Sequence, residues 1–289
     1  MIASDTARAM ATTEITRQQV VGPIVNLRPK MRAKIAAIAI NTFRESVRDR
    51  VLYNLILFVL ILIGASVFVS ELSIDQESKF IMDLGLSLML VFGALIAIFI
   101  GVGLVFKEID KRTIYNLLSK PVHRYEFIIG KFFGLCMTLL VNCVVMVIGI
   151  ELALMYVNGG FVSLQLTLLP AAYLIFLELA LVVAIALMFS SFSTPMLAAL
   201  FTFAIYVIGN FSADLRLAAE LTDSAITRVI LTVLYYLLPN LSNFSFITQA
   251  SRGSIVPLSM ALSATVYAVI YASILLSAAA LIFQKRNFK

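Results

Sequence analysis

The sequence has few charged residues, a single histidine and no tryptophan. Of its 289 residues, 13% are charged and 61% are hydrophobic, whereas a soluble domain has about 25% charged and about 45–50% apolar residues. A chain of this length cannot bury so much apolar surface in a globular core. The composition therefore excludes a soluble enzyme, a disordered chain and a disulfide-linked secreted domain, and it favours a membrane protein with several spans.

Motifs for catalysis or metal binding are also lacking. The chain has no G-x-x-x-x-G-K-[ST] sequence, so it cannot bind ATP through a P-loop, and it has no H-E-x-x-H or G-x-S-x-G sequence. One histidine, His123, cannot build a histidine metal cluster. Cys136 and Cys143 lie seven residues apart in one apolar run, which favours packing over a metal or redox role. We therefore expect a chain that is not an enzyme and holds no cofactor or metal.

The apolar residues form long unbroken runs, which are typical of transmembrane helices rather than of barrel strands. We predict an all-α polytopic membrane protein with a six-span domain over residues 51–289. Each run except the fifth reaches the about 20 residues that a bilayer requires, and the fifth is short and starts at Pro195. The expected spans are residues 51–70, 84–106, 132–157, 168–189, 195–211 and 258–283.

Two segments precede the first span. Residues 1–30 are polar and contain no apolar signal sequence, so we expect a mobile cytosolic tail. Residues 31–50 predict an amphipathic helix in the headgroup plane. Its apolar positions are Ile35, Ile38, Ala39, Thr42, Phe43 and Val47. The candidate interfacial residues are Phe43, Arg44, Glu45, Arg48, Asp49 and Arg50.

The distribution of basic residues predicts the orientation. In the six-span arrangement, 18 of the 22 Lys and Arg residues lie on the side that holds both termini and the loop 107–131, and four lie on the other side. Because cytoplasmic segments are enriched in Lys and Arg, we expect both termini to be cytosolic. The expected location is the bacterial cytoplasmic membrane, and the basic charge does not imply a nucleic-acid partner.

The segment 211–259 is long for an outer loop. Within it, residues 225–238 are apolar for about 14 residues before Pro239 and Asn240. This run is too short to cross a bilayer, which favours an interfacial or re-entrant helix.

The segment 106–134 is charged, yet it carries apolar residues at helical spacing. Ile109, Ile114, Leu117 and Leu118 share one face of a predicted helix, and Pro121 ends it. Such a helix would lie across the inner mouth of two spans, where a cytosolic partner could push on it. A plain positive-inside loop is the alternative.

The same segment resembles the loop after the second span in permease subunits of ABC-2-type transporters. The matching residues are Glu108, Arg112-Thr113, Leu117-Leu118-Ser119, Pro121, Arg124, Glu126 and Gly130-Lys131. Arg112 stands where the common family form has glycine, which resembles the subgroup linked to multicopper-enzyme maturation and nitrous-oxide reductase assembly. Residues 42–50 and 235–244 are similar to the family's helix before the first span and its outer segment before the last span, so the resemblance covers residues 33–289.

The resemblance implies a permease that forms a translocation path with a second copy or a paralogue. Separate cytosolic ATPase subunits, with ATP and Mg, would drive it, and export is the expected direction. Residues 108–120 would be the coupling helix. The residues implied in coupling are Glu108, Asp110, Arg112, Thr113, Tyr115, Leu118, Pro121, Arg124 and Glu126. The alternatives are a membrane assembly factor that recruits a soluble partner through residues 107–127, and a secondary transporter.

Polar residues within the spans are the remaining candidates. Glu178 lies near the middle of the fourth span, where an ionised carboxylate costs several kcal/mol unless it is paired, hydrated or protonated. Asn142 or a hydroxyl is its expected partner, and Glu151 is expected near the outer interface. These three residues are candidates for the translocation path, and a packing role is the alternative. Two stripes of small residues, 93/97/101 and 264/268/272, predict close packing of helices within the chain.

Overall fold

The computed structural model describes residues 31–48, 51–72, 76–110, 124–160, 163–222 and 224–285. Helices and turns make up this part of the chain, without any strand, and the expected all-α class is confirmed. Residues 34–289 form one compact unit, and the packing below is within it. The helices are α2 (Met31–Arg48), α3 (Val51–Leu72), α4 (Glu77–Asp110), α6 (Arg124–Asn158), α7 (Leu168–Ser190), α8 (Pro195–Asn210), α9 (Ser212–Leu221), α10 (Ala225–Leu237), α11 (Ile247–Ser251) and α12 (Leu258–Lys285), with short 3₁₀ helices η1 (Ser163–Thr167) and η2 (Leu241–Phe244).

Four helices are long and apolar enough to cross a membrane, and they contain the second, third, fourth and sixth expected spans. Their apolar stretches are Glu77–Leu104, Tyr125–Asn158, Leu164–Ser190 and Leu258–Phe283. The first expected span lies on α3, which is apolar over Leu55–Ala65, and the fifth lies on α8, which has only 16 residues. The described helices thus provide four to six candidate spans, and the count of six stays a prediction.

The helices on either side of the expected cytosolic loop are longer than the sequence pattern indicated. The expected cytosolic segment 107–131 includes the ends of both helices, because α4 continues to Asp110 and α6 already begins at Arg124. Lysine, arginine and glutamate are good helix formers, so the helices continue past the apolar runs. Hydrophobicity marks where a span meets the bilayer, but it does not mark where the helix ends.

The central helix of the bundle is α7. In its most apolar window 72% of the residues are buried, against 28% in α12. Close packing on α4 requires small residues there, since a Cβ at Gly93 would lie 2.4 Å from Leu179 and one at Gly101 would lie 3.1 Å from Ala186. The stripe in α12 is also buried, at Ala264, Ala268 and Ala272. Both stripes therefore pack within the chain, as predicted.

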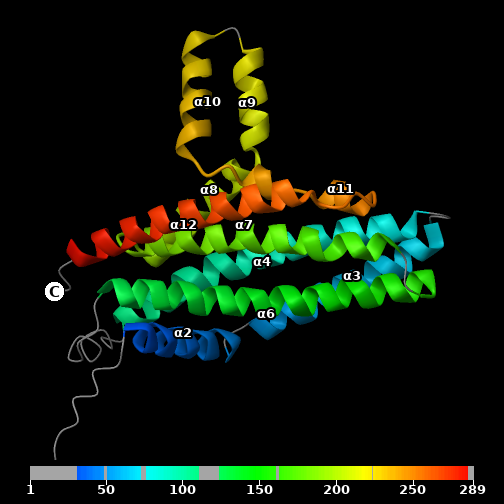
Figure 1. Cartoon of the computed structure of the whole chain (residues 1–289), viewed down its shortest axis with the longest axis horizontal. Coiled ribbons are helices and arrows are strands. Elements are labelled where there is room, and N and C mark those ends of the chain that lie inside the picture. The colour runs from blue at the N-terminus through cyan, green and yellow to red at the C-terminus, as the bar shows by residue number, and fades with distance from the viewer. Residues whose placement is uncertain are drawn as a thin grey trace, which may run out of the picture. The chain divides into compact units, whose positions relative to one another are not determined.

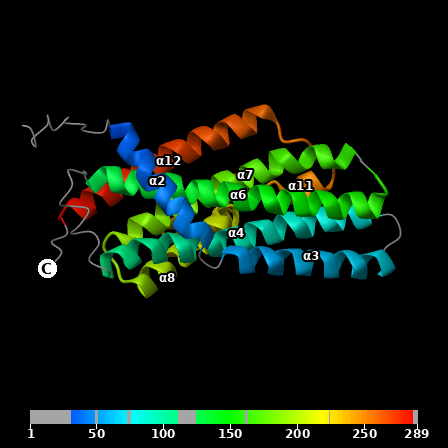
Figure 2. The same ribbon diagram turned by 90° about the horizontal axis from the view of Figure 1, so that it is seen from below.

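Contacts at the two ends show how the long helices run. At one end, Phe127 of α6 stacks on Phe283 of α12 with ring centroids 5.9 Å apart. At the other end, the Ser78 hydroxyl of α4 donates a hydrogen bond to Asn158 of α6 at 2.5 Å. The helix α6 is therefore antiparallel to α4 and to α12, as Figure 2 shows for α4 and α6. In contrast, α4 and α7 run parallel, since Gly93 faces Leu179 and Gly101 faces Ala186. We call the end with Phe127 the inner end, because the charge count predicts that it faces the cytosol.

A hairpin of two short helices, α9 and α10, stands away from the long helices (Figure 1). The chain bends by 60° between α8 and α9. The expected helix over residues 225–238 corresponds to α10, but α9 lies in a segment for which the sequence predicted an outer loop.

Candidate functional site

The inner end contains a junction between α2 and the beginning of α6. Two glycines of α6 allow the close approach, since a Cβ at Gly130 would lie 2.7 Å from Ile38 and one at Gly134 would lie 2.6 Å from the carbonyl oxygen of Ala39. Thr42, which faces Gly134, is completely buried. The two backbones therefore touch where α6 emerges from the segment implied in coupling.

The buried face of α2 differs from the predicted apolar face at one position. Ser46 is completely buried and its hydroxyl donates a hydrogen bond to the Thr42 carbonyl at 2.8 Å, whereas Val47 is 43% exposed. The contact with α6 therefore covers only part of the predicted apolar face, and the placement of that face in the headgroup plane stays a prediction. Phe43 and Glu45 are half-buried, and Arg44 is exposed. The side chain of Arg48 and both Asp49 and Arg50 lie outside the described residues.

Charged side chains are buried in this junction. Glu126 is 2% exposed, and its Oε2 lies 3.8 Å from Nζ of Lys34 on α2. Lys131, one turn further along α6, is 1% exposed, and its Nζ lies 5.7 Å from the ring centroid of Phe127. A buried charge is costly unless it is paired, so these groups favour the packed position of α2 over a detached one.

The residues implied in coupling divide into two groups. Glu108 and Asp110 lie in the last turn of α4, and Arg124 and Glu126 lie in the first turn of α6. These two helices pack on each other. The others lie outside the described residues: Arg112, Thr113, Tyr115, Leu118 and Pro121. Of the described members, Glu126 faces α2 and is not available on the surface.

Half-way along α7, Glu178 is completely buried. Its Oε1 accepts a hydrogen bond from Nδ2 of Asn210 at 2.9 Å, and its Oε2 has no hydrogen-bond partner among the described residues. The expected partner was wrong, since Asn142 donates to the carbonyl oxygen of Thr138 within α6 at 2.8 Å. Glu151 is half-buried on α6, two turns before the helix ends.

The length of α8 explains why Asn210 was missed. A helix of 16 residues is about 24 Å long, which is shorter than the roughly 30 Å hydrocarbon layer. The last residue of α8 therefore lies beside the middle of α7, although the sequence analysis placed it near the outer surface. The short fifth apolar run was the available signal for this arrangement.

A second group of polar side chains holds the base of the hairpin together. The Ser212 hydroxyl donates to Oδ1 of Asn240 at 2.6 Å, and Ser242 donates to the same oxygen at 2.7 Å. The backbone N–H of Asn240 donates to the Tyr267 hydroxyl of α12 at 2.9 Å. Both ends of the hairpin are thus fixed to each other and to the bundle near Glu178.

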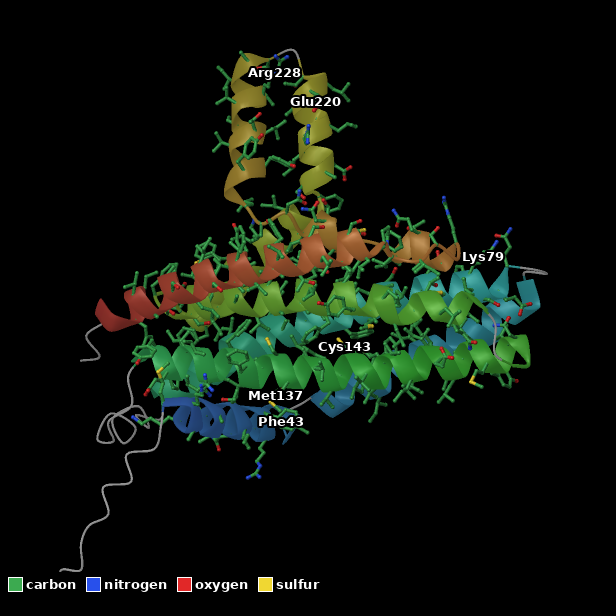
Figure 3. The ribbon with its side chains drawn as sticks, in the orientation of Figure 1. Phe43, Lys79, Met137, Cys143, Glu220 and Arg228 are labelled. Carbon is green, nitrogen blue, oxygen red and sulfur yellow. The ribbon has the colours of Figure 1, made fainter. Side chains whose placement is uncertain are left out.

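Within the hairpin, Arg216 and Arg228 join the two helices. The guanidinium of Arg216 lies 3.3 Å from Glu220 and 6.0 Å from the ring centroid of Tyr235. Arg228 donates to the Thr222 carbonyl oxygen at 2.8 Å. Figure 3 shows Glu220 and Arg228 toward the free end of the hairpin, away from the bundle.

A family model described as ABC-2 family transporter protein matches residues 36–288, which is nearly the whole described chain. The chain belongs to the ABC-2 transporter family. It is accordingly a membrane permease of an ABC transporter, a component that is not itself catalytic, and the family generally works with cytosolic ABC ATPase partners. No curated protein matches the chain. The resemblance found in the sequence is confirmed for the family, while the match does not distinguish the subgroup.

Among the described residues there is no group of three or more His, Cys, Asp or Glu side chains that could hold a metal ion. Both cysteines of α6 are free thiols, Cys143 buried and Cys136 half-buried.

Proposed function

We propose that this chain is the pore-forming subunit of an exporter in the bacterial cytoplasmic membrane and that separate ATPases drive it from the inner end. The family match over residues 36–288 is the observation that carries this proposal. Two such chains, identical or paralogous, line the path, and both termini face the cytosol. The substrate class is left open.

The junction at the inner end supports a route for force. The segment 111–123 connects α4 to α6, and the first turn of α6 is attached to α2 through the Lys34–Glu126 pair and the contacts at Gly130 and Gly134. A push on this segment would therefore move α2, α4 and α6 together. In this arrangement Glu126 transmits the movement, and the ATPase contacts are left to residues 108–121.

Breaking the coupling segment tests the proposal. Tyr115→Pro should abolish the stimulation of ATP hydrolysis by the permease, because proline removes a helical hydrogen bond and costs about 3 kcal/mol in a helix interior. Tyr115→Ala, which is compatible with the helix predicted over residues 108–120, should retain most of the stimulation. The measurement is the hydrolysis rate of the co-purified complex in lipid vesicles, with the yield of folded permease as the control. Equal stimulation by Tyr115→Pro and the unchanged protein would show that this segment is not the coupling element.

A further inference from the structure

The α9–α10 hairpin leaves the bundle at the depth of the membrane interior. Glu178, which holds the end of α8, is 12 residues from the inner end of α7 at Ser190, or about 18 Å. The base of the hairpin begins two residues after Asn210, at Ser212. Because the hydrocarbon layer is about 30 Å thick, the hairpin starts inside it and projects sideways from the long helices (Figure 1).

One side of α10 is apolar and uncovered. Five large residues follow the spacing of a single helical face, and each is more than half exposed. They are Ile226, Val229, Ile230, Val233 and Tyr236. Among the described elements, α10 packs against α9. Two helices of 10 and 13 residues are too short to be stable without further packing.

Neither water nor lipid alone suits the whole hairpin. The stripe on α10 is disfavoured in water, whereas Arg216 and Glu220, 66% and 65% exposed, would lie in hydrocarbon if lipid surrounded the hairpin. A charged group at the centre of a bilayer costs about 2.5–3.5 kcal/mol on insertion scales, and such groups almost always face protein or a water-filled cavity. A protein surface that covers the stripe and shields the charges satisfies both requirements.

The exposed area of the hairpin matches a second copy of the chain. Phe211, Leu217 and Leu221 add to the five residues of the stripe. A fully exposed apolar side chain of this size offers roughly 60–120 Å², and more than half of each of these eight is exposed. Together they contribute roughly 300–600 Å², a large part of the about 800 Å² that each partner buries in a typical stable interface. The hairpin also carries both signs of charge, so two copies related by a twofold axis can place basic groups of one beside acidic groups of the other.

From these observations we infer that the α9–α10 hairpin is an arm that packs against a second copy of this chain within the membrane. This inference rests on the proposed function, which already requires two permease chains. The bond between Glu178 and Asn210 and the Ser212–Asn240 contact set the direction of the arm. The arm packs on the partner at the depth where α8 ends. It thereby fills the part of the membrane that α8, with 16 residues, is too short to span.

The absence of tryptophan makes a fluorescence test direct. Val233→Trp places one fluorophore on the stripe, and Val144→Trp places one at a matched site on α6, since the two valines are 54% and 50% exposed. In Figure 1, α6 lies on the side of the bundle away from the hairpin. In vesicles that contain brominated lipids, tryptophan at 144 should be strongly quenched and tryptophan at 233 at most a third as much. Equal quenching at the two sites would overturn the inference, because it would show that lipid covers the stripe. Strong quenching at 233 by aqueous iodide would also overturn it, because it would show that water covers the stripe.

Cysteine cross-linking at the same two positions identifies the partner. In a background with Cys136→Ala and Cys143→Ala, a flexible bifunctional maleimide should convert most Val233→Cys protein into a dimer of this chain, and little of the Val144→Cys protein. A dimer yield at 233 no higher than at 144 would overturn the inference. Neither measurement uses an ATPase, so the two proposals are tested separately. A failure to cross-link at 233 contradicts the arm but not ATPase coupling, and a loss of ATPase stimulation contradicts the coupling but not the arm.

Discussion

Replacing Gly134 with alanine is expected to push α2 away from α6. A Cβ at this position would lie 2.6 Å from the Ala39 carbonyl oxygen and 2.6 Å from Cβ of Thr42, which is 0.8 Å inside the 3.4 Å where ordinary contact begins. The Ala39 oxygen belongs to the backbone and Thr42 is β-branched and buried, so neither atom can turn aside. The two helices must separate instead.

Gly103 supplies the matched control, because a Cβ there would meet nothing within 4 Å. In both variants alanine gains about 0.8–1.0 kcal/mol of helix propensity over glycine. Overpacking costs about 1–3 kcal/mol. The free energy of unfolding should therefore fall by up to about 2 kcal/mol in Gly134→Ala and rise by up to about 1 kcal/mol in Gly103→Ala.

The assay is thermal unfolding of the detergent-purified protein, followed with a thiol-reactive dye that reports exposure of the buried Cys143. Thr42→Ala added to Gly134→Ala should restore only part of the loss, because the clash with the Ala39 oxygen remains. If Gly134→Ala unfolds at or above the temperature of Gly103→Ala, the α2–α6 junction is not packed as described.

Four further substitutions test the buried polar groups. Glu126→Gln should lower the free energy of unfolding by about 1 kcal/mol, and Lys34→Gln should add little once Glu126 is changed, because the two residues act as a pair; additive losses in a double-mutant cycle would contradict the pairing. Glu178→Gln should stay within about 1 kcal/mol of the unchanged protein, because its amide oxygen keeps an acceptor for Asn210. Glu178→Leu should lose about 1–3 kcal/mol, because it removes that acceptor and leaves Nδ2 of Asn210 with only the Tyr206 carbonyl oxygen at 3.1 Å. Equal losses in the two Glu178 variants, measured by thermal unfolding, would remove the Asn210 bond from the account.

Hydrophobic runs predicted the helices well, since each expected span falls on a helix of the structure. A helix that crosses a bilayer must be apolar over its length, so the apolar run in the sequence is enough to predict where the span lies. Helix ends were predicted less well, because α4 and α6 continue through charged residues that the bilayer would exclude. The small residues of α4 and α12 predicted close packing correctly, since only such residues let two backbones approach.

Pairings across the fold were beyond the sequence. The bond between Glu178 and Asn210 depends on where a short α8 ends beside α7, and the Lys34–Glu126 pair depends on the crossing of α2 over α6. A single sequence gives no such distances. The helix α9 was missed because its charged residues Asp214, Arg216 and Glu220 resemble a solvated loop when the segment is considered without its partner α10.

The central claim is that ATP hydrolysis by a separate cytosolic protein moves this permease from its inner end. The most direct measurement is the ATP hydrolysis rate of the ABC ATPase that co-purifies with this chain, in lipid vesicles with and without the permease. The account predicts a stable complex and a severalfold higher rate when the permease is present. A permease that fails to bind that ATPase, or that transports its cargo uphill without any nucleotide, would contradict the account.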